Sequence, residues 1–402
     1  MKEYDRIQIQ DICSRISSGG TPKSTVEKYY GGNIPWLNTK EVNFNRIHST
    51  ERTITEEGLQ NSSAKWIDEN AVIVAMYGAT AGKSAISKIR LTTNQACCNL
   101  NIDPDKADYR FVYYALYNDY SRLASLANGG AQQNLNAMQI KEFEIPYPSI
   151  EEQTAIANFL SALDDKIEVN RQINDNLEQQ ALALYKSWFV DFEPFKDGDF
   201  VESELGLIPK GWKVAELSSV TKQITEKVKD RTDVKVLSPV NTGELVLSEE
   251  YFTKQVFSES VSKYIVVKPL QFAYNPARVN IGSLGMNTFT FDGCVSPVYV
   301  VFECESNYHH FFDYYRKTDG FKEEVLTRAI GGVRQTLSYK DFSLMKLVYP
   351  PQEVVEKFNS IYGKLLDNIN SIKSENTKLS DLRDTLLPKL MSGELKINEI
   401  DC

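Results

Sequence analysis

The sequence predicts an α+β protein built by duplication: two copies of a mixed globular domain, each followed by a long helix, the helices forming an antiparallel coiled coil. Three observations support this prediction. A short motif recurs about 202 residues further along the chain, an extended helical pattern follows each copy, and both globular halves mix β-branched runs with helical stretches. A period close to half the chain indicates two domain copies rather than a solenoid.

The recurring motif marks corresponding points in the two copies. Gly129-Gly130-Ala131-Gln132-Gln133-Asn134-Leu135 returns as Gly331-Gly332-Val333-Arg334-Gln335-Thr336-Leu337, and Tyr-Pro follows shortly after each, at Tyr147-Pro148 and Tyr349-Pro350. Upstream, Lys65-Trp66-Ile67 corresponds to Lys263-Tyr264-Ile265. The repeat and a Pro- and Gly-containing linker after the first helix divide the chain into 1–148, 149–193, 194–349 and 350–396.

A narrow apolar seam follows each Tyr-Pro. Apolar residues recur at alternating steps of three and four, which is the spacing of a coiled coil. Asn174 and Asn376 occupy equivalent seam positions, where a polar side chain costs stability and fixes register. The length and narrowness of the seams favour packing of the two helices on each other over packing of each helix on its own domain. The seams are Ile156, Leu160, Leu163, Ile167, Asn170, Asn174, Leu177, Ala181, Leu184 and Trp188, and Phe358, Tyr362, Leu365, Ile369, Ile372, Asn376, Leu379, Arg383, Leu386 and Leu390.

Composition indicates a soluble globular protein of 402 residues, with 42% hydrophobic and 25% charged residues. No apolar run is long enough to span a membrane, and none follows the start as a signal core. Six cysteines without a CxxC pair and only three histidines argue against zinc and favour reduced, cytoplasmic thiols.

The net charge of −9 does not exclude nucleic acid. Residues 149–197 hold four basic and ten acidic side chains, whereas residues 1–148 hold sixteen of each. A neutral domain can carry a local basic face, so the acidity weakens only the case for tight DNA binding by the chain alone.

Three patterns that would indicate catalysis are incomplete. In the run from Gly78 to Ser84 three residues separate the glycine from Gly-Lys-Ser, and Tyr77 stands where a nucleotide-binding loop has its glycine. We interpret this run as a small-residue loop whose lysine can approach a DNA backbone. Asn275-Pro276-Ala277-Arg278 is similar to the Asn-Pro-Pro-aromatic tetrapeptide of amino-methyltransferases, but lacks the second proline and the aromatic residue. A stand-alone DNA adenine methyltransferase remains the alternative. With only His48, His309 and His310 available, no nucleophilic triad is predicted.

Polar and aromatic residues near glycines in both copies form the predicted DNA-binding set. Arg pairs with guanine and Asn or Gln with adenine through two hydrogen bonds, while Lys and Ser hold phosphates. For any one of these residues the alternative is an exposed turn position. The repetition of the set favours function. Its members are Tyr77, Lys83, Ser84, Asn94, Gln95, Gln132, Gln133 and Asn134, and Tyr274, Asn275, Arg278, Asn280, Arg334, Gln335 and Thr336.

This arrangement resembles the specificity subunits of Type I restriction–modification systems over nearly the whole chain. One departure is Pro351-Gln352-Glu353, where a match to Ile150-Glu151-Glu152-Gln153 is expected. The phrases that carry the resemblance are Met76-Tyr77-Gly78-Ala79-Thr80-Ala81-Gly82-Lys83, Asn94-Gln95-Ala96-Cys97, the two Gly-Gly motifs, Leu205-Gly206-Leu207-Ile208-Pro209-Lys210-Gly211-Trp212, Asn275-Pro276-Ala277-Arg278, and Leu386-Leu387-Pro388-Lys389-Leu390-Met391-Ser392-Gly393-Glu394-Leu395.

The resemblance implies a non-catalytic DNA-binding subunit. The segments 1–148 and 194–349 would be target-recognition domains, each reading one half of a split, asymmetric site in double-stranded DNA. The helices at 149–193 and 350–396 would be spacers that set the gap between the half-sites. Two methylation subunits would dock on the helices, and motor–nuclease subunits would join for restriction. No cofactor is expected for this chain, because S-adenosylmethionine, ATP and magnesium would belong to those partners.

Overall fold

The computed structural model describes residues 4–127, 134–252, 257–258, 260–305, 307–328 and 336–397. The chain divides into two compact units. Unit 1 consists of Met1–Gln172 and Ile372–Cys402, and unit 2 consists of Ile173–Ser371.

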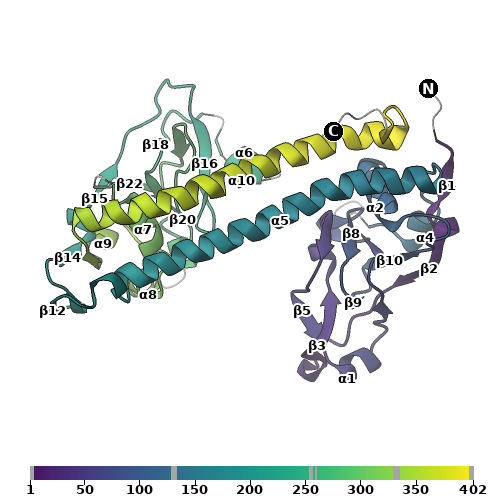
Figure 1. Ribbon diagram of the computed structural model, residues 1–402, viewed down its shortest axis with the longest axis horizontal. Helices are drawn as coiled ribbons and strands as arrows, with labels where there is room; N and C mark the ends of the chain where they lie inside the picture. The colour runs from purple at the N-terminus through teal and green to yellow at the C-terminus, as the bar shows by residue number, and fades with distance from the viewer. Residues whose placement is uncertain are drawn as a thin grey trace. The chain divides into compact units, whose positions relative to one another are not determined.

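Unit 1 holds two small sheets (Figure 1). The larger has the strand order β2-β10-β7-β8-β4, and the smaller has β5-β3-β9-β6, in which β3 and β9 run parallel. The run Val72-Ile73-Val74-Ala75 forms β7, a fully buried central strand, as its unbroken β-branched residues predict. The bounds are β2 Cys13–Ser18, β10 Cys97–Ile102, β7 Val72–Ala75, β8 Ser84–Ser87, β4 Asn45–Ile47, β5 Arg52–Ile54, β3 Tyr30–Leu37, β9 Leu91–Thr93 and β6 Trp66–Ile67, with β1 Arg6–Gln8 pairing β11 Glu144–Pro146.

Unit 2 repeats this topology. Its two sheets have the orders β15-β22-β19-β20, which matches the larger sheet of unit 1 up to β8, and β17-β16-β21-β18, in which the parallel pair is again internal, between β16 and β21. A hairpin, β12–β13, precedes the second copy. The bounds are β15 Thr221–Ile224, β22 Val300–Cys304, β19 Phe272–Tyr274, β20 Leu284–Met286, β17 Leu245–Leu247, β16 Lys235–Pro239, β21 Gly293–Val295, β18 Ile265–Val267, β12 Phe200–Ser203 and β13 Gly206–Pro209, with β14 Lys213–Glu216 pairing β23 Lys346–Tyr349. The duplication predicted from the sequence is therefore present in the fold.

Two short helices follow β10 in unit 1, and two follow the corresponding strand, β22, in unit 2. They are α2 (Tyr109–Asn118) and α3 (Tyr120–Ala124) after β10, and α7 (His309–Tyr315) and α8 (Asp319–Arg328) after β22. The remaining short helices are α1 Glu56–Gln60, α4 Ala137–Lys141, α6 Ser248–Tyr251 and α9 Tyr339–Ser343, and the 3-10 turns are η1 Ile9–Ile12, η2 Glu27–Tyr29, η3 Thr39–Glu41, η4 Gly78–Thr80, η5 Glu193–Phe195, η6 Leu217–Ser219 and η7 Val279–Ile281.

Two long helices, α5 (Ile150–Phe189) and α10 (Gln352–Ser392), follow the two Tyr-Pro positions. At the start of α5, the Ser149 hydroxyl accepts a hydrogen bond from the Glu152 N–H at 3.3 Å, which satisfies one of the unpaired donors of the first turn. α10 begins after Pro350-Pro351 and ends at Ser392, and the next residue, Gly393, has a φ of +74°, which is typical of a glycine that terminates a helix.

The two helices run antiparallel within each unit (Figure 1). In unit 1, Asp164 meets Arg383 at 2.7 Å, and the Asn170 side chain donates to Asn376 at 2.9 Å. In unit 2, the Asn174 side chain donates to the Ile369 carbonyl, and Phe358 packs edge-on against Tyr185. The α+β fold class with its antiparallel helix pair is thus confirmed.

The helices also pack on the globular parts. Packing of the helices on each other and packing of each helix on a domain, the two alternatives considered from the sequence, therefore occur together. In unit 2, Tyr185 and Phe189 of α5 and Phe358 and Tyr362 of α10 are buried in the main core. In unit 1, the corresponding core contacts come from Ile156, Ala157 and Leu160 of α5 and from Leu387, Leu390 and Met391 of α10.

Candidate nucleic-acid interface

Three segments of unit 1 meet at the end of β7. The Met76 N–H donates to the Ala96 carbonyl, and the Met76 carbonyl accepts from the Leu135 N–H, both at 2.8 Å. Tyr77 forms an antiparallel bridge with Asn134. These backbone bonds bring together the exposed side chains of Tyr77, Gln95 and Asn134, which lie far apart in the sequence.

The glycine-containing loop after Tyr77 is a turn between two strands. The Gly82 N–H donates to the Ala75 carbonyl at 2.8 Å, and the chain continues into β8 rather than into a helix. A nucleotide-binding loop needs the N-terminus of a helix at that point, so this loop lacks the element that would hold a nucleotide phosphate. Gly78 has a φ of +78° with open space around it, which lets the turn reverse without strain.

Lys83 leaves this loop in a defined direction. Its Nζ donates to the Asn43 side chain at 2.6 Å and lies 5.7 Å from the centre of the Phe44 ring. Phe44, in turn, stacks on Tyr117 of α2 with ring centres 4.4 Å apart. The ammonium group is thus positioned in advance and keeps hydrogens free for a phosphate. Asn43 and Phe44 were not predicted from the sequence, because their role depends on contacts between distant segments.

The same linkage recurs in unit 2. The Pro276 carbonyl accepts from the Leu337 N–H at 3.0 Å, as Met76 does from Leu135. Asn275 accepts the Ala277 N–H through its side chain at 3.0 Å, which makes Asn275-Pro276-Ala277-Arg278 a local turn. Arg278 and Thr336 are exposed and Asn280 is half-buried.

Arg278 is the cation of this turn. The Ile281 and Ser283 N–H groups both donate to its carbonyl at 3.1 Å, so its backbone is fixed. Among the residues that the structure describes, no acidic side chain pairs with its guanidinium group. It is therefore free to meet a partner.

Three members of the predicted set are not at the surface. Ser84 is fully buried in β8, Asn94 is 8% exposed and turns back onto the Ala96 N–H, and Tyr274 is fully buried. Tyr274 packs against Phe302 and Phe342, and burial raises the pKa of its phenol. These three side chains support the loops from the protein interior, and we do not propose them as DNA contacts. Gln132, Gln133, Arg334 and Gln335 lie outside the described residues.

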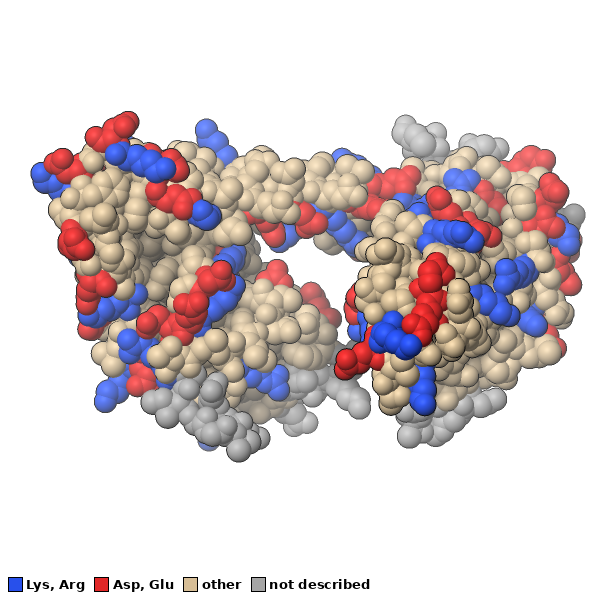
Figure 2. All heavy atoms as spheres, turned by 90° about the horizontal axis from the view of Figure 1, so that it is seen from below, with Lys and Arg blue, Asp and Glu red and all other residues tan. Residues whose placement is uncertain are grey.

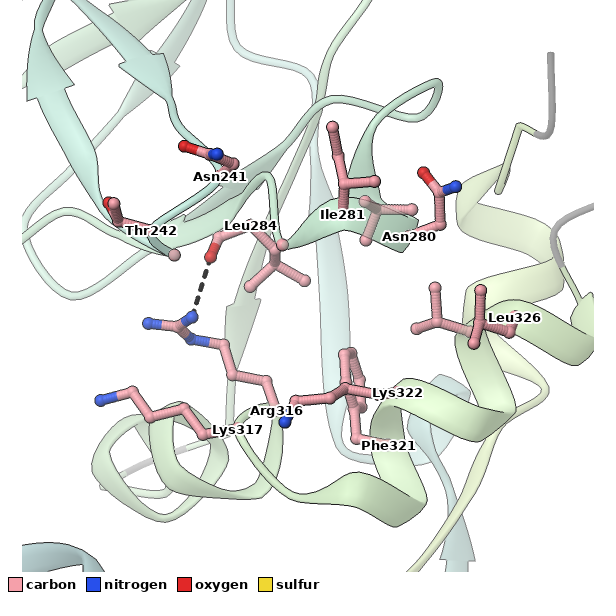
Figure 3. Close-up of a pocket in the computed structure, with 14 residues that line it drawn as sticks. Asn241, Thr242, Asn280, Ile281, Leu284, Arg316, Lys317, Phe321, Lys322 and Leu326 are labelled. Atoms are coloured by element: carbon pink, nitrogen blue, oxygen red, sulfur yellow. Dashed lines mark hydrogen bonds between the residues drawn. The ribbon is translucent and has the colours of Figure 1, made fainter. Parts of the chain in front are cut away.

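A pocket of about 480 Å³ opens in unit 2 between η7 and α8 (Figure 3). Asn280 and Ile281 of η7 line it opposite Phe321 and Leu326 of α8. Arg316 spans its floor. It donates to the Leu284 carbonyl at 2.9 Å and pairs with Asp313 at 2.6 Å. Because Arg316 is already neutralised, we assign it to holding the turn after η7 on α7 rather than to binding an anion.

The surface carries charges of both signs. On the face shown in Figure 2, basic and acidic side chains are interspersed over most of the area. The described residues include no group of three or more His, Cys, Asp or Glu side chains arranged to hold a metal ion. None of the described helices is long and apolar enough to cross a membrane.

Comparison with known proteins agrees with this architecture. Residues 1–179 match the family described as the Type I restriction modification DNA specificity domain. The Type I restriction enzyme MjaIX specificity subunit of Methanocaldococcus jannaschii is 31% identical, over 99% of this chain and 95% of that protein. The chain belongs to the family of Type I restriction–modification specificity subunits.

Other relatives also match this chain over nearly its whole length. The MjaVIII specificity subunit of the same organism is 23% identical, over 100% of this chain and 95% of its own length. The crystal structure of the Type I restriction–modification S subunit from M. genitalium superimposes with a TM-score of 0.57 at 20% identity, covering 96% of each chain. That likeness supports the shared fold.

Proposed function

We propose that the chain reads a bipartite, asymmetric DNA site and directs the methylation and restriction subunits of its system to that site. The observation that carries the proposal is the duplication: two copies of one topology present matching exposed loops at the ends of β7 and β19. Two readers on one chain suit a site with two parts of different sequence.

The exposed residues of these loops have the chemistry of base and phosphate recognition. In unit 1, Gln95 and Asn134 suit adenine, Tyr77 offers an aromatic face with a hydroxyl, and Lys83 suits a phosphate. In unit 2, Arg278 suits guanine, and Asn275, Asn280 and Thr336 are polar neighbours. Gln132, Gln133, Arg334 and Gln335, from the Gly-Gly motifs, complete the proposed set.

The helix pair has the features of a spacer and of a docking surface for two methylation subunits. Its polar layer, with Asn170 hydrogen-bonded to Glu375 and Asn376, favours one register over others. Val169, Ile173 and Leu182 of α5 and Ile361 and Leu382 of α10 are between 42% and 49% exposed, which leaves apolar area for partners. Motor–nuclease subunits would join this assembly, in the cytoplasm where its DNA lies.

We infer that the chain itself is not a catalyst. S-adenosylmethionine, ATP and magnesium belong to the partner subunits in this proposal. The test begins with the purified chain, which should transfer no methyl group to DNA and show no calorimetric binding of S-adenosylmethionine or ATP. Micromolar binding of either, or methyl transfer, would instead favour the stand-alone DNA adenine methyltransferase.

The positive arm uses the chain with its own methylation subunits. Methylome sequencing of a host that expresses the whole system should yield one two-part motif, and the purified complex should bind that motif in preference to a scrambled one. A methylated motif with a single part would contradict the two-reader proposal.

A further inference from the structure

We propose that each copy carries a phosphate-holding ridge of lysines beside its base-reading loops: Lys23 and Lys65 in unit 1, and Lys227, Lys229 and Lys263 in unit 2. The inference rests on the proposed function and deepens it. It assigns sequence-independent backbone contacts to residues that were not in the predicted DNA-binding set.

In unit 1 the ridge is built on two glycines in the loop after β2. A Cβ on Gly19 would lie 2.1 Å from the Thr93 carbonyl oxygen, and a Cβ on Gly20 would lie 2.2 Å from the Ala64 nitrogen. Only glycine permits such a close approach of backbones. The Gly20 N–H also donates to the Thr93 carbonyl at 2.9 Å. The contact with Ala64 brings the loop that ends in Lys23 against the segment that ends in Lys65.

This loop is continuous with the proposed base-reading site. The Thr21 hydroxyl contacts the Gln95 side chain, and the Trp36 indole N–H donates to the Gly20 carbonyl at 2.9 Å. The ridge therefore borders the loop that carries Gln95. A duplex whose groove met Gln95 would bring its backbone toward this ridge.

In unit 2 the corresponding loop, after β15, reaches the same place by different contacts. The Val228 N–H donates to the Tyr264 carbonyl at 3.0 Å, and the Lys229 N–H donates to the Ser262 carbonyl at 2.9 Å. The backbone of Lys227 forms an isolated antiparallel β-bridge with that of Ile265. Val228 and Tyr264 are buried in the same cluster. This loop therefore also lies against the segment Lys263-Tyr264 that leads into β18.

The ridge lysines are unpaired, unlike three cations that lie close to them in the sequence. All five are exposed, and no described acidic side chain pairs with them. Nearby cations are neutralised: Lys28 pairs with Glu57, Lys268 with Glu226 at 3.0 Å, and Arg231 with Asp292 at 2.8 Å.

The two copies thus keep free lysines at the same topological position although the loop sequences differ, as Gly-Gly-Thr-Pro-Lys and Thr-Glu-Lys-Val-Lys. A flexible ammonium group with three donors suits a phosphate, whose position varies little with sequence. Neutralising a phosphate releases counterions, so each contact should add about 0.9 to the slope of log affinity against log salt.

The experiment uses the chain assembled with its methylation subunits and DNA that carries the methylated motif. Lys23→Gln with Lys65→Gln, and separately Lys227→Gln with Lys229→Gln and Lys263→Gln, should reduce the salt slope by about one unit per lysine that contacts a phosphate. Affinity at low salt should fall about tenfold or more for each set. Preference among half-site variants should stay unchanged, because phosphates carry no base identity.

Matched controls remove the same charge from lysines that acids already neutralise. In unit 1, Lys106 pairs with Asp103 at 4.0 Å and donates to the Asp11 carbonyl at 3.0 Å. Lys28→Gln with Lys106→Gln, and Lys268→Gln in unit 2, should leave the slope within about 0.3 units, on the same scale. Equal slopes for the ridge and control variants would overturn the ridge and leave the proposed function standing. A change in base preference would also overturn it, since the lysines would then read bases. If the unmodified complex bound its motif no better than scrambled DNA, the proposed function would fail first.

Discussion

At the scale of single residues, Arg278 is the side chain of unit 2 best placed to read a base. Its carbonyl accepts two backbone hydrogen bonds, so the side chain projects from a fixed point, and no described acid competes for its guanidinium group. Arg278→Ala should weaken binding of the assembled complex by about 1–3 kcal/mol and relax selection at one base position.

Arg278→Lys separates the two modes of contact. Lysine keeps the charge but loses the two-pronged donor geometry, so selection should still relax if Arg278 reads guanine. A phosphate contact would survive this substitution nearly intact. The measurement is the affinity for a panel of half-site variants at two salt concentrations. A loss that is equal on every variant would place Arg278 on the backbone.

His310 makes unit 2 sensitive to acid. Burial and the neighbouring His309 lower its pKa to about 4, against the weaker opposite effect of Asp313. Its Nδ1 has no hydrogen-bond partner, and its ring packs on Tyr362 of α10. In the unfolded chain the His310 imidazole binds a proton near pH 6.5, whereas in the folded chain the same imidazole binds it only near pH 4. Stability should therefore fall as pH decreases between these two values.

The expected loss is about 2 kcal/mol for a partly exposed imidazole with this shift. His310→Gln should flatten the dependence of the unfolding midpoint on pH between 4 and 6.5. Asp313 does not confuse the result, because its pKa is lowered to about 2 and its contribution is lost only below this window. An unchanged profile for His310→Gln would refute the assignment.

At the scale of elements, the polar layer of the helix pair is the clearest test of register. Asn170 is 1% exposed and donates to Glu375 at 2.7 Å and to Asn376 at 2.9 Å. Asn170→Ala removes one partner of a buried hydrogen bond and should destabilise unit 1 by about 1–3 kcal/mol. Asn170→Leu combined with Asn376→Leu removes both ends of the Asn170–Asn376 hydrogen bond and leaves Glu375 paired with Lys166 at 3.6 Å, so it should cost less than Asn170→Ala.

Hydrogen exchange across residues 160–172 and 372–384 measures both effects inside the full chain. Val169→Ala, at a position 49% exposed on the same helix, should change protection by less than about 0.5 kcal/mol. If Asn170→Ala proved as neutral as Val169→Ala, the polar layer would not contribute to holding the helices together.

The same helices show what the sequence could and could not predict. Their positions were predictable because an apolar period near 3.5 is a strong signal when it is sustained over about five heptads. Tyr185 and Phe189 lay outside the predicted seam, yet both are buried, because α5 packs on the globular core as well as on α10. The predicted seam includes only the face of α5 that packs on α10, and not the face that packs on the globular core.

The site was less predictable than the fold. Composition and glycine neighbours located the loops at the ends of β7 and β19. They could not separate exposed Tyr77 from buried Tyr274, since both follow or end a buried strand. Exposure depends on which residues of other segments, such as Phe302 and Phe342, fill the space above a side chain. That information is nonlocal.

At the scale of the whole molecule, the duplication implies that the two halves read DNA independently. Each strand pair that the structure describes joins two strands of the same unit. A change in the loops of one unit therefore has no sheet through which to alter the loops of the other. Single substitutions should change only the half-site that their own unit reads.

Arg334 is the sharpest probe of this independence, because it replaces Gln132 of the first copy beside the repeated Gln335. If Arg334 meets a guanine edge, Arg334→Ala should cost about 1–3 kcal/mol and relax one base position in the second half-site. If it meets a phosphate, the loss should be equal on all sequences and the salt slope should fall by about one. The affinity of the assembled complex for half-site panels at two salt concentrations decides between them. Unchanged binding would remove Arg334 from the site, whereas altered preference in the half-site read by unit 1 would contradict independent reading, because Arg334 belongs to unit 2.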